Sequence, residues 1–459
     1  MHTLPITLDY TLRDLYSIDS EDDPNNVLIY YPLQFGHNHE GASAKFAYEY
    51  RVEDDSEDAA SSLTMAANMV PQRYAFSAGK MPLVILDFPS KESDSEIQPD
   101  CERKGPLPLH QIDIHRTFAQ LQHHQRPAVS FAKSPDSIEL GLNAKIAVLL
   151  PTDCLTHLPH LTCPETHYEI LSKRGLAMSG LPTPPSRVID TILIDSEDPT
   201  LLAEETTRMT ESIDQHALPF MVKLPQSISG MGTFAITSEA ERAHVKAMLQ
   251  TQLGSMLRQL NHSNHHLYPC SIVLQDFVSG PVVALSLFVT KTGSPIFIAC
   301  CEQLFDDHSH WIGGSISYAQ QAHFQTTFSA LVDKIAAFLH RKGYHGPAGV
   351  DIVTDTRTGE QMVIDLNVRV TGTFHLGPLR GHFTSRGLGE VAMTTGDFFC
   401  SRDLFEGVFA DEIQRGSLIV SGWVHGEGAK SHAAITVGAG DVGELQEFLA
   451  RVRAAGLPN

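Results

Sequence analysis

The sequence has no long hydrophobic run and no recognisable secretory signal. Its most apolar window, residues 271–290, is interrupted by polar residues and by Pro281. A membrane-spanning helix requires roughly 18 or more consecutive apolar residues, which no segment of the chain supplies. Residues 1–5 lack the basic region and the apolar core that begin a signal peptide. These absences predict a cytoplasmic protein that does not enter a membrane.

Cysteine is also scarce. The chain has seven cysteines in 459 residues, scattered except for the neighbours Cys300 and Cys301, and none forms a Cys-x-x-Cys pair. This usage is typical of free thiols in a reducing compartment and not of a disulfide framework. Neither a Ser/His/Asp nor a Cys/His nucleophile signature is evident, so the sequence does not predict covalent catalysis by a side chain.

Basic residues are the minority among the charges. Lysine and arginine number 33 against 54 aspartates and glutamates, which gives a formal net charge of −21. Nucleic acid is therefore not expected as a partner, because phosphate binding requires a concentrated basic surface. Hydrophobic residues at 42% and charged residues at 19% are typical of a globular protein. The length is sufficient for about three domains.

Short apolar runs bounded by turn residues predict an α/β (α+β) fold. Three of them fit buried parallel strands of an N-terminal α/β domain, and they lie at residues 27–31, 83–86 and 146–150. An apolar face formed by Tyr168, Leu171 and Leu176 predicts one helix that begins at Pro164. A capping box of Ser238 and Glu241 predicts the start of another helix.

The C-terminal region contains a glycine motif without a dinucleotide fold. Residues 438–443 match Gly-x-Gly-x-x-Gly and follow a strand-like run at 433–437. A dinucleotide fold needs a further strand with an acidic residue about 20 positions later, and the sequence stops at Asn459. We therefore predict a strand, a turn and a helix in a small C-terminal module.

One predicted hairpin carries the most informative polar residues. Two β-like runs flank a turn at 356–359, so Asp351 lies on the first strand and Asp365, Asn367 and Arg369 share one face of the second. Two carboxylates, an amide oxygen and a guanidinium suit Mg²⁺ and polyphosphate, because Mg²⁺ prefers hard oxygen ligands. The alternative is a surface hairpin whose polar residues face water.

A second candidate site precedes this hairpin. A strand that ends in Lys223 leads into a loop with Ser229, Gly230 and Gly232 and then into the run 233–236. Glycines let backbone N–H groups approach phosphate oxygens, and lysine adds a point charge. The alternative is an ordinary hairpin turn, which glycine and serine also form.

These elements stand in a fixed order with an apolar strand that ends in a hinge at residues 275–278. The order of lysine strand, hinge and acidic hairpin resembles the ATP-grasp superfamily, and more closely its carboxylate–amine ligases and its members in fungal secondary metabolism. Residues 172–184 resemble the opening helix of that family's nucleotide-binding region. The resemblance covers roughly residues 160–380. It implies an ATP-grasp fold in four parts: a Rossmann-like domain at 1–160, subdomains at 161–275 and 276–400, and the module at 401–459.

Carried over residue by residue, the resemblance implies a nucleotide and metal site. Lys223 would contact the adenine and the α-phosphate, and Arg369 would lie at the transferring phosphate, so both would be catalytic. ATP would also be held by the glycine loop and the hinge, namely Ser229, Gly230, Gly232, Gln275, Asp276, Phe277 and Val278. Mg²⁺ or Mn²⁺ would be held by Asp351, Asp365 and Asn367.

Two departures from the family pattern concern this implied site. The second metal acid of the family is usually glutamate, whereas Asp365 is shorter by one methylene group. The family often has a ribose-binding glutamate shortly after the hinge glycine, where this chain has Val282 and Val283.

The implied reaction joins a small-molecule carboxylate to an amine through an acyl phosphate. Arg380 is a candidate for binding the carboxylate and His375 for deprotonating the amine, although a surface arginine and a structural histidine are the alternatives. Gly313 and Gly314, in a predicted loop after Trp311, are candidates for the border of the substrate pocket. A homodimer is compatible with the resemblance. An ATP-grasp kinase and a nucleotide-binding protein without turnover are the alternative functions.

Overall fold

The computed structural model describes residues 5–19, 26–30, 44–48, 65, 68–86, 107–195, 197–227, 232–306, 310–426 and 430–456. Six cysteines lie in these ranges, and all six are free. None of the helices in these ranges combines the length and the apolar character that crossing a membrane requires. The predicted phosphate-loop residues Ser229 and Gly230 lie outside the described residues.

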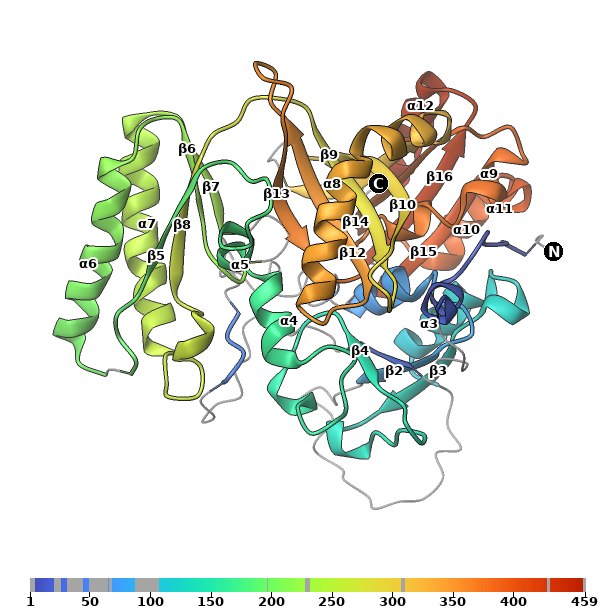
Figure 1. Ribbon diagram of the computed structural model, residues 1–459. Coiled ribbons are helices and arrows are strands. Elements are labelled where there is room, and N and C mark those ends of the chain that lie inside the picture. The colour runs from blue at the N-terminus through green and yellow to red at the C-terminus, as the bar shows by residue number, and fades with distance from the viewer. Residues whose placement is uncertain are drawn as a thin grey trace.

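The N-terminal part contains a parallel sheet, shown at the bottom of Figure 1. Its strand order is β3-β2-β1-β4, and every neighbouring pair is parallel, as the sequence predicted for three of the four strands. Strand β1 is buried along its whole length, which agrees with its uninterrupted apolar run. Its strands are β1 (Val27–Tyr30), β2 (Pro82–Leu86), β3 (Ala128–Ala132) and β4 (Ile146–Val148), and its helices are α1 (Leu12–Ser17) and α3 (Leu109–Ala119).

A second, antiparallel sheet lies at the far left of Figure 1, where two long helices cover one of its faces. We call it the lid sheet. Its order is β5-β8-β6-β7, and the predicted capping box of Ser238 and Glu241 begins α7. Its strands are β5 (Ser186–Asp190), β6 (Phe220–Lys223), β7 (Thr233–Ile236) and β8 (Ser271–Asp276), and the helices are α6 (Pro199–Gln215) and α7 (Glu239–Arg258).

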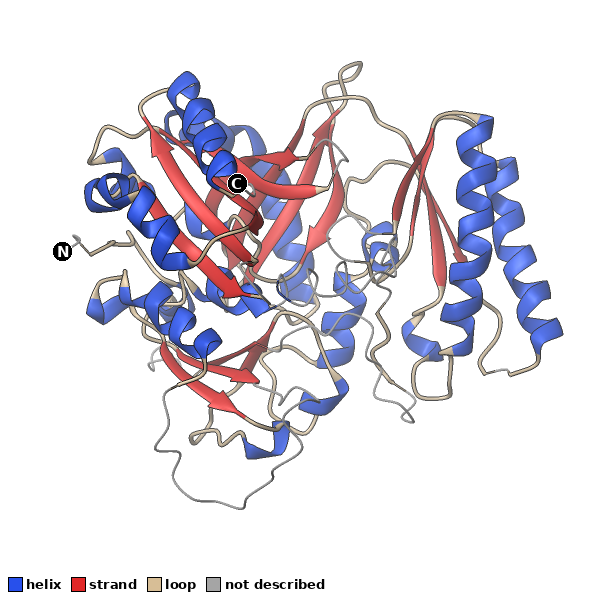
Figure 2. Cartoon of the chain, turned by 180° about the vertical axis from the view of Figure 1, so that it is seen from behind, coloured by secondary structure: helices blue, strands red, loops and turns tan. Residues whose placement is uncertain are grey.

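A large sheet of eight strands forms the centre of the molecule, with helices on both sides (Figure 2). Its order is β13-β12-β9-β10-β11-β14-β16-β15. Its strands are β9 (Val282–Val289), β10 (Pro295–Phe305), β11 (Trp311–Ser317), β12 (Gly346–Thr354), β13 (Gln361–Asn367), β14 (Glu390–Phe398), β15 (Leu418–His425) and β16 (Ser431–Ala439). The associated helices are α8 (Gln321–Arg341), α9 (Arg380–Thr384), α10 (Arg402–Val408), α11 (Ala410–Arg415) and α12 (Val442–Ala455). The predicted C-terminal strand, turn and helix are confirmed as β16 and α12.

The helix predicted from Pro164 is interrupted. It consists of α4 (Pro164–Leu171) and α5 (Lys173–Ala177), separated by Ser172 in an extended conformation. The Ser172 hydroxyl accepts a hydrogen bond of 2.7 Å from the Gly175 backbone N–H, so this serine caps α5 instead of continuing α4. The single helix was wrong because the apolar spacing of Leu171 and Leu176 spans the cap. The break places Lys173 at the first position of α5.

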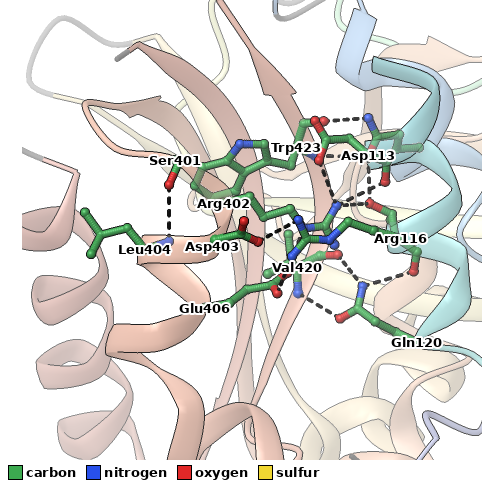
Figure 3. A network of polar contacts seen from close by, with 12 residues as sticks. Asp113, Arg116, Gln120, Ser401, Arg402, Asp403, Leu404, Glu406, Val420 and Trp423 are labelled. Atoms are coloured by element: carbon green, nitrogen blue, oxygen red, sulfur yellow. Dashed lines mark hydrogen bonds and ion pairs between the residues drawn. The ribbon is translucent and has the colours of Figure 1, made fainter. Parts of the chain in front are cut away.

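An ion network around the buried Arg402 connects helix α3 of the N-terminal part to helix α10 (Figure 3). The Arg402 side chain of α10 is 1% exposed and lies 2.7 Å from Glu406 and 3.5 Å from Asp113 of α3. Arg116 of α3 pairs with Glu406 and with Asp403 at 2.7 and 2.8 Å. We call these five residues the docking network. It matches each buried charge with an opposite one, which a buried ion requires.

Candidate functional site

The predicted hairpin is confirmed as the antiparallel pair β12 and β13. Asp351 lies directly opposite Asp365 in the register of the two strands. The Asn367 amide donates a hydrogen bond of 3.3 Å to the Asp365 carboxylate, and the Arg369 guanidinium donates one of 3.1 Å to the Asn367 carbonyl oxygen. The three alternating side chains therefore form one continuous polar row. We call this pair of strands the acidic ribbon.

The two carboxylates of the ribbon have opposite pKa shifts. Burial, followed by the charge of Asp365, raises the pKa of Asp351 to about 7. Burial would also raise the pKa of Asp365, but Lys173 and Lys223 outweigh it and hold that pKa below its usual value. Lys173 contributes most, because its Nζ atom lies 2.9 Å from the Asp365 carboxylate. The ribbon thus presents one carboxylate that is already ionised and one that a further cation would help to ionise.

Lysines from outside the ribbon complete this polar cluster. The Lys223 Nζ, at the end of β6 in the lid sheet, donates a hydrogen bond of 2.7 Å to the Ile364 carbonyl oxygen of β13. Burial, as the largest effect, lowers the pKa of Lys223 to about 8. Lys173 additionally donates to the Ser227 carbonyl oxygen at 3.3 Å. The two lysines therefore join the lid sheet and α5 to the acidic ribbon.

The hinge after β8 lies against the turn of the ribbon. The Ser279 carbonyl oxygen accepts hydrogen bonds of 3.0 Å from both the backbone N–H and the hydroxyl of Thr356. The Gln275 side chain is buried and donates to Ser186 at 3.1 Å, while the Asp276 carboxylate pairs with His216 at 3.1 Å. Phe277 is exposed. The Asp276 backbone N–H also donates 2.9 Å to the Pro185 carbonyl oxygen, so the backbone groups left for a ligand are those of the next two hinge residues, 277 and 278.

The predicted glycine loop is closed by the described residues at its two ends. The Leu224 backbone N–H donates 2.8 Å to the Gly232 carbonyl oxygen, which joins the two ends of the β6–β7 connection. Gly232 has φ +74°, and a Cβ there would lie 2.8 Å from the Ser227 Cβ. Glycine is therefore required for the shape of this turn.

The arrangement of lid sheet, hinge and acidic ribbon matches a known domain family. Residues 221–373 match the model of the ATP-grasp domain. This part of the chain is an ATP-grasp domain. The matched residues extend from the strand that carries Lys223, through the hinge and the large-sheet strands β9 to β13, and past Arg369.

Solved structures share this ATP-grasp fold over nearly the whole chain. An ADP complex of N5-carboxyaminoimidazole ribonucleotide synthetase has a TM-score of 0.52 at 11% identity, covering 94% of this chain and 97% of that one. An L-amino acid ligase from Bacillus licheniformis has a TM-score of 0.51 at 11% identity, covering 95% and 98%. N5-carboxyaminoimidazole synthetase from Staphylococcus aureus, complexed with ADP, has a TM-score of 0.50 at 10% identity, covering 93% and 96%. Among curated proteins, none matches the sequence significantly.

The acidic ribbon of this ATP-grasp domain fits a magnesium ion bound together with phosphate. The described residues contain no group of three or more His, Cys, Asp or Glu side chains that could hold a metal alone. Mg²⁺ does not need one, because it is usually bound by one or two carboxylates, substrate phosphates and water. Asp351 and Asp365 supply two carboxylates at facing positions, and a cation between them would relieve the repulsion that raises the pKa of Asp351.

Sequence reasoning missed two polar members of this cluster. Lys173 lies in the segment that resembles the family's opening helix, but only the fold shows that it reaches Asp365. Gln303 of β10 donates a side-chain hydrogen bond that lowers the pKa of Asp351 against the effect of burial. Lysine at the start of α5 was a usable signal. No sequence signal indicated Gln303, because its strand shows no regular alternation of polar and apolar residues.

The glycines predicted for the pocket border lie inside the large sheet. Gly313 and Gly314 belong to strand β11 and pair with Thr394 and Met393 of β14, so the predicted loop was wrong. Both are buried, and a Cβ at Gly313 would lie 1.9 Å from the Met393 carbonyl oxygen. Close strand packing accounts for these glycines, and their substrate role stays a prediction.

Arg380 and His375 lie apart from the polar row. Arg380 begins α9 and is exposed, and its charge acts on Tyr10 of the N-terminal segment. His375 is buried, its Nε2 lies 3.0 Å from the Thr436 hydroxyl, and burial together with the charge of Arg73 lowers its pKa to about 3. A base this weak suits a structural histidine, so amine deprotonation by His375 stays a prediction that its surroundings do not favour.

A small cavity of about 40 Å³ lies on the other side of Arg369. Its wall includes Tyr30 at the end of β1, His160, and Tyr344 just before β12. Arg369 therefore lies between the acidic ribbon and the N-terminal parallel sheet.

Proposed function

We propose that this ATP-grasp protein is an ADP-forming ligase that joins a carboxylate to an amine through an acyl phosphate. The observation that carries the proposal is the convergence of two lysines and one arginine on a pair of facing carboxylates. Lys223 and Lys173 reach the ribbon at 2.7 and 2.9 Å, and Arg369 continues its polar row. The solved neighbours include two ADP complexes and an L-amino acid ligase, which supports this reaction class.

In the proposed complex, the acidic ribbon and the lid sheet hold MgATP between them. Asp351, Asp365 and Asn367 would hold Mg²⁺, which would neutralise charge on the phosphates. Lys223 and Lys173 would donate to phosphate oxygens, since both ammonium groups already lie at the ribbon. The backbone of the hinge at 275–278 would receive the adenine, and Gly232 would shape the loop over the phosphates.

Catalysis in this proposal consists of positioning and charge neutralisation. The substrate carboxylate oxygen forms a bond to the γ-phosphorus as the bond from that phosphorus to ADP breaks. The amine nitrogen then attacks the acyl carbon, phosphate leaves, and the amine proton is released. Phosphoryl transfer needs little covalent help from the protein, which agrees with the lack of a nucleophile signature. Arg369 would stabilise the negative charge that builds up at the transferring group.

The test is to measure ADP release with panels of carboxylates, each with and without amines. The proposal predicts turnover that depends on an acid, with phosphate release and amide formation that depend on an amine. Asp365→Ala and Asn367→Ala are expected to abolish turnover and leave the circular dichroism spectrum unchanged. Retained activity in either variant would contradict the metal assignment.

The same assays separate the proposal from the other ATP-grasp reactions. An acyl phosphate reacts with hydroxylamine, whereas a phosphorylated alcohol does not. ADP formation with a product stable to hydroxylamine would indicate a kinase instead of a ligase. Binding of MgATP without ADP release across the whole panel would indicate a protein that has no turnover.

A further inference from the structure

We propose that Arg73 and Arg369 together form the binding site for the carboxylate of the acid substrate. This inference rests on the proposed ligase function and assigns its acid site. Arg73 comes from the N-terminal part of the chain, in the helical residues 68–75, and Arg369 follows strand β13 of the acidic ribbon. Arg380, the candidate for this role from the sequence, is exposed at the start of α9.

The two guanidiniums share one tyrosine. The Arg73 guanidinium donates a hydrogen bond of 3.2 Å to the Tyr74 hydroxyl, and its Cζ lies 4.8 Å from the centre of the Tyr74 ring. The Arg369 Cζ lies 5.9 Å from the centre of the same ring. A small ligand bound at the Tyr74 hydroxyl would thus be close enough to contact both guanidiniums.

Neither arginine has an acidic partner among the described residues. Arg73 is 7% exposed, and its Nε is buried without a hydrogen-bond partner. The only ring and hydrogen-bond contacts of its guanidinium there are with Tyr74 and Trp311. Arg369 donates to neutral oxygens of Asn367 and Val370 and is also hydrogen-bonded to the Tyr74 hydroxyl. Burying a guanidinium without an anion is costly, so a site that keeps one is prepared for an anion from outside the chain.

The packing around Arg73 holds its guanidinium in place. Its Cζ lies 5.2 Å from the centre of the Trp311 ring, in addition to its contact with the Tyr74 ring. Gly372, three residues after Arg369, leaves room for this packing, because a Cβ there would lie 2.7 Å from the Trp311 ring and 3.3 Å from the Arg73 Cζ. A planar cation in contact with two aromatic rings keeps its N–H groups oriented for a planar, two-oxygen anion.

The surroundings favour an acid over an amine at this position. Burial raises the pKa of the Tyr74 hydroxyl, yet the charges of Arg73 and Arg369 prevail and hold that pKa below its usual value. The local field is therefore positive, and it repels an ammonium group. Arg369 also contacts Asn367, which contacts Asp365, so an acid bound here lies next to the proposed metal and phosphate ligands.

Acetate serves as the probe, because it is a small carboxylate that carries no other functional group. Its binding to the full-length protein is measured without nucleotide by thermal shift and by isothermal titration, against sodium chloride at the same ionic strength. Wild type is expected to bind acetate saturably. Arg73→Met and Arg369→Met are each expected to weaken that binding at least about tenfold, because each removes a charge-assisted hydrogen-bond donor. Arg187→Met, an exposed position on β5, is the matched control and is expected to bind as wild type does.

Stability without acetate provides a second readout. Arg73→Met is expected to keep or raise the melting temperature, because it removes a buried cation that has no anion. A lower melting temperature would assign Arg73 to the structure and overturn the proposal. Arg73→Lys keeps the charge but loses the planar fork, so it is expected to fold and to bind acetate more weakly than wild type.

The remaining outcomes are decisive as well. The proposal is overturned if wild type does not distinguish acetate from chloride, if Arg73→Met and Arg73→Lys bind acetate as wild type does, or if inorganic phosphate binds here and acetate does not. Binding of MgATP is titrated separately. Acetate binding that depends on Arg73 in a protein that binds no MgATP would retain the anion site and reject the ligase. MgATP binding without acetate binding would do the reverse.

Discussion

Arg402 and Arg73 are both almost fully buried arginines, but their surroundings differ. Arg402 lies in the docking network, where Glu406 and Asp113 balance its charge at 2.7 and 3.5 Å. Arg73 lies beside the acidic ribbon in contact with two aromatic rings, and no acid among the described residues pairs with it. The first arginine connects parts of the chain. The second has no opposite charge among the described residues, and it lies where two parts of the chain meet a candidate active site.

This difference shows how a structural charge can be distinguished from a functional one. A fold that buries an ion for its own stability also buries the counter-ion, because the desolvation cost is otherwise not recovered. A binding site leaves the counter-charge to its ligand. The acidic ribbon is the corresponding case with negative charges. Burial, followed by the charge of Asp365, raises the pKa of Asp351 to about 7.

The largest expected effect is on catalysis. Arg369→Met removes the guanidinium that the ribbon and the proposed acid site share, and turnover is expected to fall by a factor of about 10² to 10³. The unfolding free energy is expected to change little, because Arg369 leaves no acid unpaired. ADP release and urea unfolding, measured on the same preparation, test both statements. A loss of stability as large as that of an Arg402 variant would contradict the comparison.

The second prediction concerns the docking network. Arg402→Met removes the buried cation that lies 2.7 Å from Glu406 and 3.5 Å from Asp113 and leaves His425 as the remaining partner of Asp113, so the unfolding free energy is expected to fall by about 3 kcal/mol. Turnover per folded molecule is expected to stay at the wild-type level. Urea unfolding followed by tryptophan fluorescence measures the first, since Trp423 is buried beside the network. Unchanged stability would mean that this arginine is no more structural than Arg73.

The third prediction uses the pH dependence of His375, which lies close enough to Arg73 to be affected by its charge. Burial, followed by that charge, holds the pKa of His375 at about 3, whereas in the unfolded chain it titrates near 6.5. The unfolded state therefore binds the proton first, and stability is expected to fall as the pH drops from 6.5 toward 3. His375→Gln is expected to reduce that slope by up to one proton, about 1.4 kcal/mol per pH unit. An unchanged slope in urea unfolding at several pH values would contradict this.

The smallest effect is expected at an ion pair whose arginine is exposed. Arg357, on the turn of the acidic ribbon, has a side chain that is 82% exposed and lies 3.5 Å from the buried Asp355. Arg357→Met is expected to change the unfolding free energy by less than about 1 kcal/mol, because a guanidinium that stays in water contributes little to an ion pair. This variant is the matched control for Arg402→Met. A large loss here would show that the contrast between buried and exposed arginines does not hold in this chain.

The sequence predicted the ribbon because its signals are local. A turn at 356–359 and the two-residue period of Asp365, Asn367 and Arg369 define a hairpin without knowledge of the rest of the fold. The capping box of α7 was local as well. The same kind of signal existed for α6, where Asp198 caps a helix with Pro199 at its first position, but its polar sequence concealed it. Strand β3 was missed because it is an edge strand with alternating exposure and no continuous apolar run.

The arrangement around the site could not be predicted in this way. Lys173 reaches Asp365, and Arg73 meets Arg369, only because separate sheets are packed together. Arg380 was preferred for the acid site because it is close to the ribbon in sequence, but a helix carries it toward Tyr10 instead. Ligand roles of the residues that the resemblance named stay predictions. The finer likeness to fungal secondary-metabolism members also stays one.

The packing of the N-terminal helix α3 against the C-terminal strand β15 has a consequence for how the protein is made. Helix α3 bonds to strand β15 through Gln120 and Val420, which are separated by 300 positions in the chain. At synthesis rates of about 5–20 residues per second, roughly 15–60 s pass before the ribosome delivers this partner. For that interval the face of α3 that contacts β15 in the folded protein is uncovered. We expect chaperone contact during translation to concentrate there, and to cease once the last two strands emerge.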